Sequence, residues 1–129
     1  MVTADQLVAH LVGDYVLQSD WMATRKTARM WVALTHAAVY ALPFLALSPS
    51  LPALAVIVGT HAVIDRWRLA RFVVWAKNFA GAPSTWRPWS DCAATGYPSE
   101  RPAWLAVWLL IIADNTLHIL VNGAALRWL

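Results

Sequence analysis

Charged residues are scarce in this chain. Asp, Glu, Lys and Arg make up only 13% of its 129 residues, whereas 60% are hydrophobic and the mean hydropathy is +0.51. A soluble domain usually has about a quarter of its residues charged. So few polar groups cannot cover this much apolar surface, which excludes an ordinary soluble globule and a disordered tail. The class that remains is an integral membrane protein with a single domain, residues 1–129.

Cysteine is nearly absent as well. Cys92 is the only one, which excludes an internal disulfide, a disulfide scaffold and a cysteine-type structural zinc site. The N-terminus also lacks a basic segment, and Asp5 interrupts it, so no signal peptide is predicted. Internal repeats and low-complexity segments are missing too, and the chain is therefore neither a repeat array nor a linker.

Long apolar runs are the dominant feature of what is present. A membrane-spanning helix needs about 20 residues, or fewer where neighbouring helices shield its ends. Backbone polar groups in hydrocarbon must be paired within the segment, so these runs are predicted to be helical. We therefore expect an all-α, four-helix transmembrane bundle, with spans at about 4–20, 30–47, 51–66 and 103–121.

The basic residues predict how the bundle is oriented. They follow the first and third runs, whereas the turn at 48–52 has none. Because basic loops stay in the cytoplasm, both termini are expected on the outer side of the membrane. The stretch 66–77 predicts a basic interfacial extension of the third helix that attracts anionic lipid headgroups. The segment 78–102 is expected to be a Pro/Trp-rich surface loop. The expected partner is thus the lipid bilayer and not nucleic acid, because the basic groups flank apolar runs; the oligomeric state stays open.

Ionisable residues inside the apolar runs carry the chemical signal. All four histidines lie in predicted spans, and three have an aspartate four residues away: His10 with Asp14, His61 with Asp65, and Asp114 with His118. The fourth, His36, stands alone in the second span. Residues four apart share one helix face. An aspartate near the bilayer centre costs about 2.5–3.5 kcal/mol, so these groups need compensation.

A shared cation would provide that compensation. The predicted metal ligands are His10, Asp14, His36, His61, Asp65, Asp114 and His118. Imidazole and carboxylate ligands favour zinc, with manganese and iron as alternatives. Seven ligands exceed what one four-coordinate ion needs, so two ions are considered. Helical depth groups Asp14, His36, His61 and Asp65 together, with His118 either a ligand or a partner of Asp114. Asp14 and Asp65 are the predicted catalytic bases.

Four motifs also resemble a known family. They are His10-Leu-Val-Gly-Asp14-Tyr15-Val-Leu-Gln18-Ser-Asp-Trp21-Met22-Ala23 followed by Lys26, Thr35-His36-Ala, Thr60-His61-Ala-Val-Ile-Asp65 and Asp114-Asn-Thr-Leu-His118. The first resembles the H-x-x-x-D-[YF]-x-x-Q opening of an uncharacterised family (a domain of unknown function) of small bacterial and phage multi-pass membrane proteins. The resemblance covers nearly the whole chain, and it implies a location in the inner membrane of the bacterium or phage host. A looser similarity to membrane-bound metal-dependent hydrolases with H-x-x-x-D on a helix implies hydrolytic chemistry.

These observations leave two main functional hypotheses. The first is a metal-dependent hydrolase that acts on a lipid or a lipid-linked (phospho)ester. The second is a non-enzymatic membrane protein, an interaction or lysis-related factor, whose Asp/His pairs only hold helices together. Interhelical hydrogen bonds in membranes average about 0.6 kcal/mol each. Proton or ion passage along the Asp/His chain is a third alternative.

Overall fold

The computed structural model describes residues 2–129, and those residues form helices and turns with no strand. The all-α prediction is confirmed. The predicted four-helix transmembrane bundle is not confirmed, because this part of the chain forms seven α-helices. They are α1 (Ala4–Leu11), α2 (Asp20–Arg25), α3 (Met30–Ala41), α4 (Leu51–Trp67), α5 (Ala70–Lys77), α6 (Trp89–Cys92) and α7 (Ala103–Trp128).

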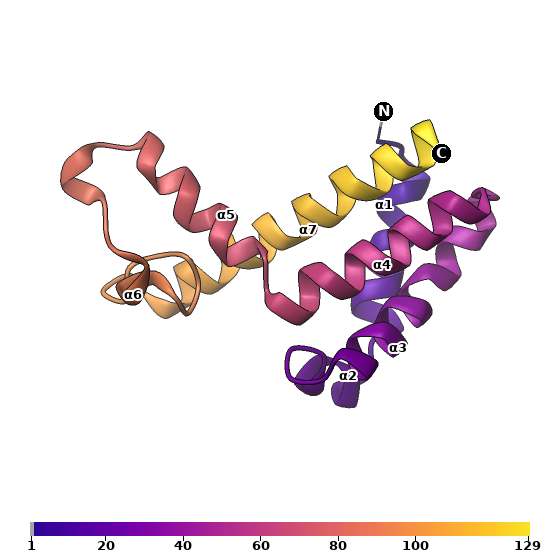
Figure 1. The fold of residues 1–129 in the computed structure, drawn as a ribbon, viewed down its shortest axis with the longest axis horizontal. Coiled ribbons are helices and arrows are strands. Elements are labelled where there is room, and N and C mark those ends of the chain that lie inside the picture. The colour runs from indigo at the N-terminus through magenta and orange to yellow at the C-terminus, as the bar shows by residue number, and fades with distance from the viewer. Residues whose placement is uncertain (1) are drawn as a thin grey trace. The chain divides into compact units, whose positions relative to one another are not determined.

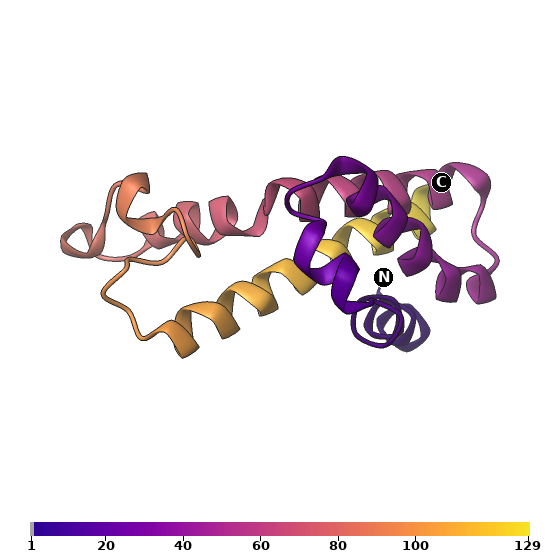
Figure 2. The same cartoon turned by 90° about the horizontal axis from the view of Figure 1, so that it is seen from below.

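Two compact units make up the chain. The first runs to Trp67 and includes His118–Leu129 at the end of α7, and the second is Arg68–Leu117. In the first unit α3 and α4 pack against each other as an antiparallel pair (Figure 1). Figure 2 looks nearly along α1. A core of apolar side chains joins these helices: Ala9, Tyr40, Phe44, Ala53, Ile57 and Ala125.

The second apolar run changes its helical geometry part-way. Helix α3 ends at Ala41, and a 3-10 segment, η2 (Leu42–Leu47), continues it. Pro43 lies at the start of η2. Proline has no N–H and its ring clashes with the carbonyl four residues earlier, so it disfavours a regular α-helix. Ser48, in the left-handed region at φ 50°, then ends the run.

The first predicted span is helical over a shorter range than expected. After α1 comes a π-helical segment, η1 (Val12–Val16), and the helix stops there rather than at residue 20. Ser19 caps the next helix, α2, by accepting a hydrogen bond from the backbone N–H of Met22. Because serine is a preferred N-cap residue, the chain begins a new helix at this point instead of extending the first.

The stretch predicted as an extension of the third helix is helical but interrupted. Arg68, at φ 52°, interrupts the helix between α4 and α5. The second unit begins here, and its loop is partly helical, with two short 3-10 segments, η3 (Asn78–Ala80) and η4 (Pro83–Thr85), in addition to α6. The Arg71 guanidinium donates to the Ala93 carbonyl at 2.9 Å and holds the loop against α5.

Two helical segments are long and apolar enough to cross a membrane: Met30–Leu47 and Ala103–Trp128. The second extends beyond the predicted end at 121. The segment formed by α1 and η1 covers residues 4–16, and α4 has 17 residues. Both are shorter than the two candidate spans. Residues 2–129 are therefore helical and contain two candidate membrane spans.

Candidate metal centre

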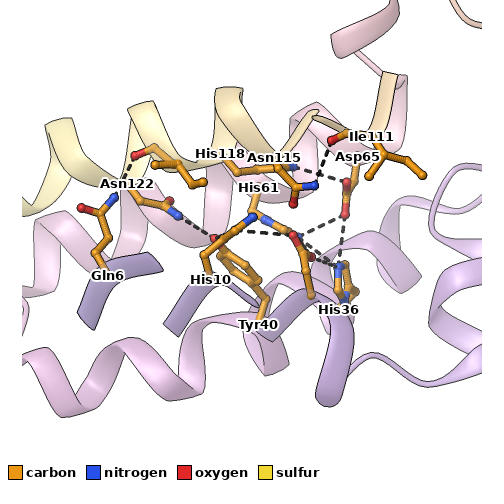
Figure 3. Close-up of polar contacts among 12 residues, drawn as sticks. Gln6, His10, His36, Tyr40, His61, Asp65, Ile111, Asn115, His118 and Asn122 are labelled. Atoms are coloured by element: carbon orange, nitrogen blue, oxygen red, sulfur yellow. Dashed lines mark hydrogen bonds and ion pairs between the residues drawn. The ribbon is translucent and has the colours of Figure 1, made fainter. Parts of the chain in front are cut away.

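Six of the seven predicted ligands lie in the first unit, on α1, η1, α3, α4 and α7. Figure 3 labels all of these ligands except Asp14. Their side chains are all buried, and none of the six residues is more than 8% exposed. They are His10, Asp14, His36, His61, Asp65 and His118. Asp114 precedes His118 by one turn of α7 and belongs to the second unit, so its role as a ligand stays a prediction.

The backbone around Asp14 is unusual. Asp14 lies within the π-helical segment η1; π-helical turns are rare, and they occur frequently at functional sites. The preceding residue, Gly13, packs so closely on α3 that a Cβ atom there would lie 2.6 Å from both the Tyr40 ring and the Tyr40 carbonyl oxygen. This close approach brings the Asp14 carboxylate to the side chains of α3 and α4.

Two imidazole nitrogens form the middle of the cluster. The Nε2 atoms of His36 and His61 are 3.0 Å apart. Asp65 Oδ2 lies 3.3 Å from the first of these nitrogens and 3.1 Å from the second. A tetrahedral zinc ion with bonds of about 2.0–2.1 Å holds its ligand atoms about 3.3–3.4 Å apart. His36, His61 and Asp65 therefore form a group that can hold a metal ion.

Asp14 approaches the same pair of nitrogens. Its Oδ1 atom is 3.2 Å from His36 Nε2 and 3.4 Å from His61 Nε2. Each imidazole nitrogen carries either one proton or one lone pair, so direct hydrogen bonds cannot satisfy all of these contacts at once. A cation shared among the four side chains would satisfy them together.

The two central histidines make their polar contacts through Nε2. In residues 2–129 neither His36 Nδ1 nor His61 Nδ1 has a hydrogen-bond partner. Most metal-binding histidines donate their second N–H to a carboxylate or carbonyl. Here ring contacts orient His61 instead: the Tyr40 ring stacks on it with centroids 3.7 Å apart, and the His118 ring lies 4.2 Å away.

His10 belongs to a neighbouring hydrogen-bond chain. The Asn122 amide donates to the Tyr40 hydroxyl oxygen, and the hydroxyl lies 2.8 Å from His10 Nδ1. Because the amide is the donor in the first bond, the hydroxyl proton is available to His10 in the second. His10 Nδ1 is also 3.5 Å from Asp14 Oδ2. A nitrogen that accepts the Tyr40 proton cannot donate to this carboxylate at the same time, so the two contacts are alternatives.

His118 approaches the other aspartate. Its Nε2 atom lies 3.6 Å from Asp65 Oδ1, the oxygen that does not face His36 and His61. A second group of possible ligands consists of Asp14, His61 and His118. The presence of two ions, one in each group, stays a prediction.

Lys26 is one of the basic residues that follow the first apolar run, and it closes the first motif. In the structure its ammonium nitrogen lies 2.8 Å from Asp65 Oδ2 and 3.2 Å from His36 Nε2. No periodic spacing relates Lys26 to these residues, so the pattern that identified the Asp/His pairs could not find it. Tyr40 and Asn122 were missed too, although each lies four residues after a histidine, the same spacing that marked the other pairs.

The family comparison agrees with the resemblance of the motifs. The family model described as "Protein of unknown function (DUF3307)" matches residues 2–125. The chain belongs to this family. All of the centre's side chains named above fall inside the part of the chain that matches DUF3307. Neither the curated proteins nor the solved structures include a match to this sequence.

Proposed function

We propose that this chain is a membrane-embedded metal-binding protein whose metal centre hydrolyses a lipid or lipid-linked phosphoester or acyl ester. The observation that carries the proposal is the convergence of two imidazole nitrogens and two carboxylates. Each of the two nitrogens lies 3.1–3.4 Å from an oxygen of each carboxylate. The donors are nitrogen and oxygen without sulfur, which favours zinc, with manganese or iron as alternatives.

A bound divalent ion would supply Lewis-acid chemistry, since it polarises a phosphoryl or acyl oxygen and acidifies a water molecule. The chain's own residues would then position the reactants. Asp14 and Lys26 are the members of the cluster with the most exposed side chains, at 10% and 17%. This makes their side the natural approach for water and substrate. A carboxylate that does not bind the metal could serve as general base, and Asp14 is better placed for this role, because Asp65 Oδ2 already faces an ammonium group.

The membrane setting supports a lipid-linked substrate. Two helical segments have the length and apolar character of membrane spans, and one of them carries His36. The basic residues between 66 and 77 would attract anionic headgroups to the same protein, at about 1 kcal/mol for each basic residue near the surface. A substrate presented by the bilayer would therefore be concentrated near the chain.

Metal content provides the first test. The full chain, purified in a mild detergent without chelators, should contain about one or two transition-metal ions per molecule by mass spectrometry. A His36→Ala/His61→Ala variant and an Asp14→Asn/Asp65→Asn variant should lose this metal. The matched control is Asp5→Asn/Asp20→Asn, which removes two exposed carboxylates of the same unit and should keep it. Metal-free wild type, or equal metal in all four proteins, would overturn the proposal.

Hydrolysis is tested separately. Release of inorganic phosphate from short-chain phosphatidic acid in micelles should depend on the metal and should be lost in the Asp14→Asn variant. If the metal binds and no ester of this class is cleaved, the binding half of the proposal stands and the hydrolytic half is wrong.

The second candidate is a non-enzymatic protein whose polar groups only clamp the helices. The ion pair between Lys26 and Asp65 favours it, because the cluster then already contains a cation of its own. Under this hypothesis, His→Gln and Asp→Asn changes at the centre would preserve the protein's activity in cells. Under the metal hypothesis the same changes abolish it.

A further inference from the structure

Lys26 lies against two of the proposed metal ligands. It is the C-cap residue of α2, and its backbone N–H bonds to the Met22 carbonyl. Its side chain extends from there to His36 Nε2 and Asp65 Oδ2, at 3.2 and 2.8 Å. Within residues 2–129 no other lysine or arginine is seen to contact the cluster. One cation of the protein thus lies where a metal ion would bind.

The two cations cannot share these atoms. His36 Nε2 has a single lone pair in the plane of the ring, and it can accept a hydrogen bond from Lys26 or bind a metal, but not both. Asp65 Oδ2 lies within reach of His36, His61 and Lys26 alike. Two positive charges at contact distance in a poorly hydrated site also repel each other strongly. Metal binding must therefore move the ammonium group away.

The net charge of the site indicates which kind of group the displaced ammonium would bind. Two carboxylates and one ammonium give a net charge of −1, and adding one divalent ion changes it to +1. An uncompensated positive charge in a buried site is unfavourable, so an anionic group of the ligand would neutralise it. Lys26 remains tethered through the end of α2, with its side chain partly exposed, so it can reach such an anion at the open side of the centre.

We infer that Lys26 occupies the metal position in the metal-free chain and, once the metal displaces it, binds the anionic oxygens of a phosphate-bearing ligand. This inference rests on the proposed function. It names the group that competes with the metal for the site and the chemical class of the substrate. Lysine is a common phosphate-binding residue that acts as a point charge, which suits a group that has to move between two positions.

The test combines two measurements on Lys26→Met, which keeps a long apolar side chain and removes the charge. Zinc affinity of the detergent-solubilised full chain is measured by competition with a chromophoric chelator. Phosphate binding is measured on the cobalt-loaded chain, from paramagnetic broadening of the phosphorus resonance of inorganic phosphate and, in a second arm, of short-chain phosphatidic acid. The matched control is Arg127→Met, which removes an exposed positive charge from the same unit and lies outside the basic stretch 66–77.

Opposite effects are expected from the one substitution. Lys26→Met should bind zinc about tenfold more tightly, because the competing cation is gone, and phosphate at least about tenfold more weakly. Arg127→Met should change neither affinity. Lys26→Arg keeps the charge and should keep the wild-type pattern. The arm that shows the stronger broadening identifies lipid phosphate or free phosphate as the preferred form.

The outcomes separate this inference from the proposed function. If wild type binds zinc but Lys26→Met binds it equally or more weakly, Lys26 does not compete with the metal and the inference is wrong. Unchanged phosphate binding in Lys26→Met would refute the role in ligand binding. If wild type binds no metal, the proposed function fails first. A misfolded Lys26→Met protein would be recognised by its helical content, and Lys26→Gln then replaces it in both measurements.

Discussion

Gly13 and Tyr40 are in direct backbone contact: a methyl group added to residue 13 would lie 2.6 Å from the ring and from the carbonyl oxygen of Tyr40. A clash of this size forces the π-helical segment η1 away from α3. We therefore expect Gly13→Ala to destabilise the chain by about 1–3 kcal/mol, the usual cost of overpacking. It should also weaken metal binding, because Asp14 is the next residue. Thermal unfolding and metal content measure the two effects.

Gly59 provides the matched control for this prediction. It lies in α4, and a Cβ atom there would meet no other atom within 4 Å. Gly59→Ala should therefore be stabilising by about 0.5–1 kcal/mol, since alanine favours a helix more than glycine does. If Gly13→Ala behaves like Gly59→Ala in both measurements, the close contact at Tyr40 does not position the aspartate.

The Tyr40 hydroxyl joins α1 to α7 through His10 and Asn122. Tyr40→Phe removes this hydroxyl and keeps the ring that stacks on His61. We expect a loss of stability of about 1–3 kcal/mol, the cost of breaking buried hydrogen bonds, with the metal content retained. Unfolding in detergent and elemental analysis of the same sample test this. Loss of metal without loss of stability would instead place the hydroxyl among the ligands.

Much of the fold could be predicted because its cause is local. Apolar runs without charge have to be helical where water is absent, and the run at 30–47 is helical throughout. The interruptions were harder to predict. The left-handed conformation of Arg68 separates α4 from α5, and arginine is not a residue type that signals such a turn. The early end of the first helix likewise depends on a π-helical segment, for which the sequence has no simple signature.

The residues of the candidate centre also fall into those that the sequence could predict and those that it could not. Four-residue spacing identified the pairs of His10 with Asp14 and of His61 with Asp65, because it places both members on one helix face. Spacing within one helix says nothing about neighbours on other helices. The position of Lys26 beside Asp65 depends on where α2 ends relative to α4, which is a tertiary relationship. For this reason the contact of Lys26 with the site could be recognised only in the structure, although the residue itself is part of the first motif.

Two serines in the turn between α3 and α4 have opposite roles. Ser48 has a left-handed backbone, at φ 50°, which costs an L-residue about 1–2 kcal/mol. Ser50 accepts a hydrogen bond from the N–H of Ala53 and donates one to the Leu129 carbonyl. Ser48→Gly should therefore stabilise the chain by about 1 kcal/mol, and Ser50→Ala should destabilise it by about 0.5–2 kcal/mol. Equal shifts of the unfolding midpoint in the two variants would contradict this assignment.

The buried thiol of Cys92 allows the closed state of the loop in the second unit to be tested. Burial raises the pKa of Cys92, and the nearby carboxylates of Asp91 and Glu100 raise it further. Only the thiolate is nucleophilic, so a raised pKa leaves less reactive thiolate at neutral pH. Alkylation by iodoacetamide should thus be slow at pH 7 and keep accelerating beyond the pH at which an exposed thiol levels off, about 8.5. Unfolding in sodium dodecyl sulfate should remove the protection. Rapid labelling of the native chain at pH 7 would show that the loop opens and exposes the thiol.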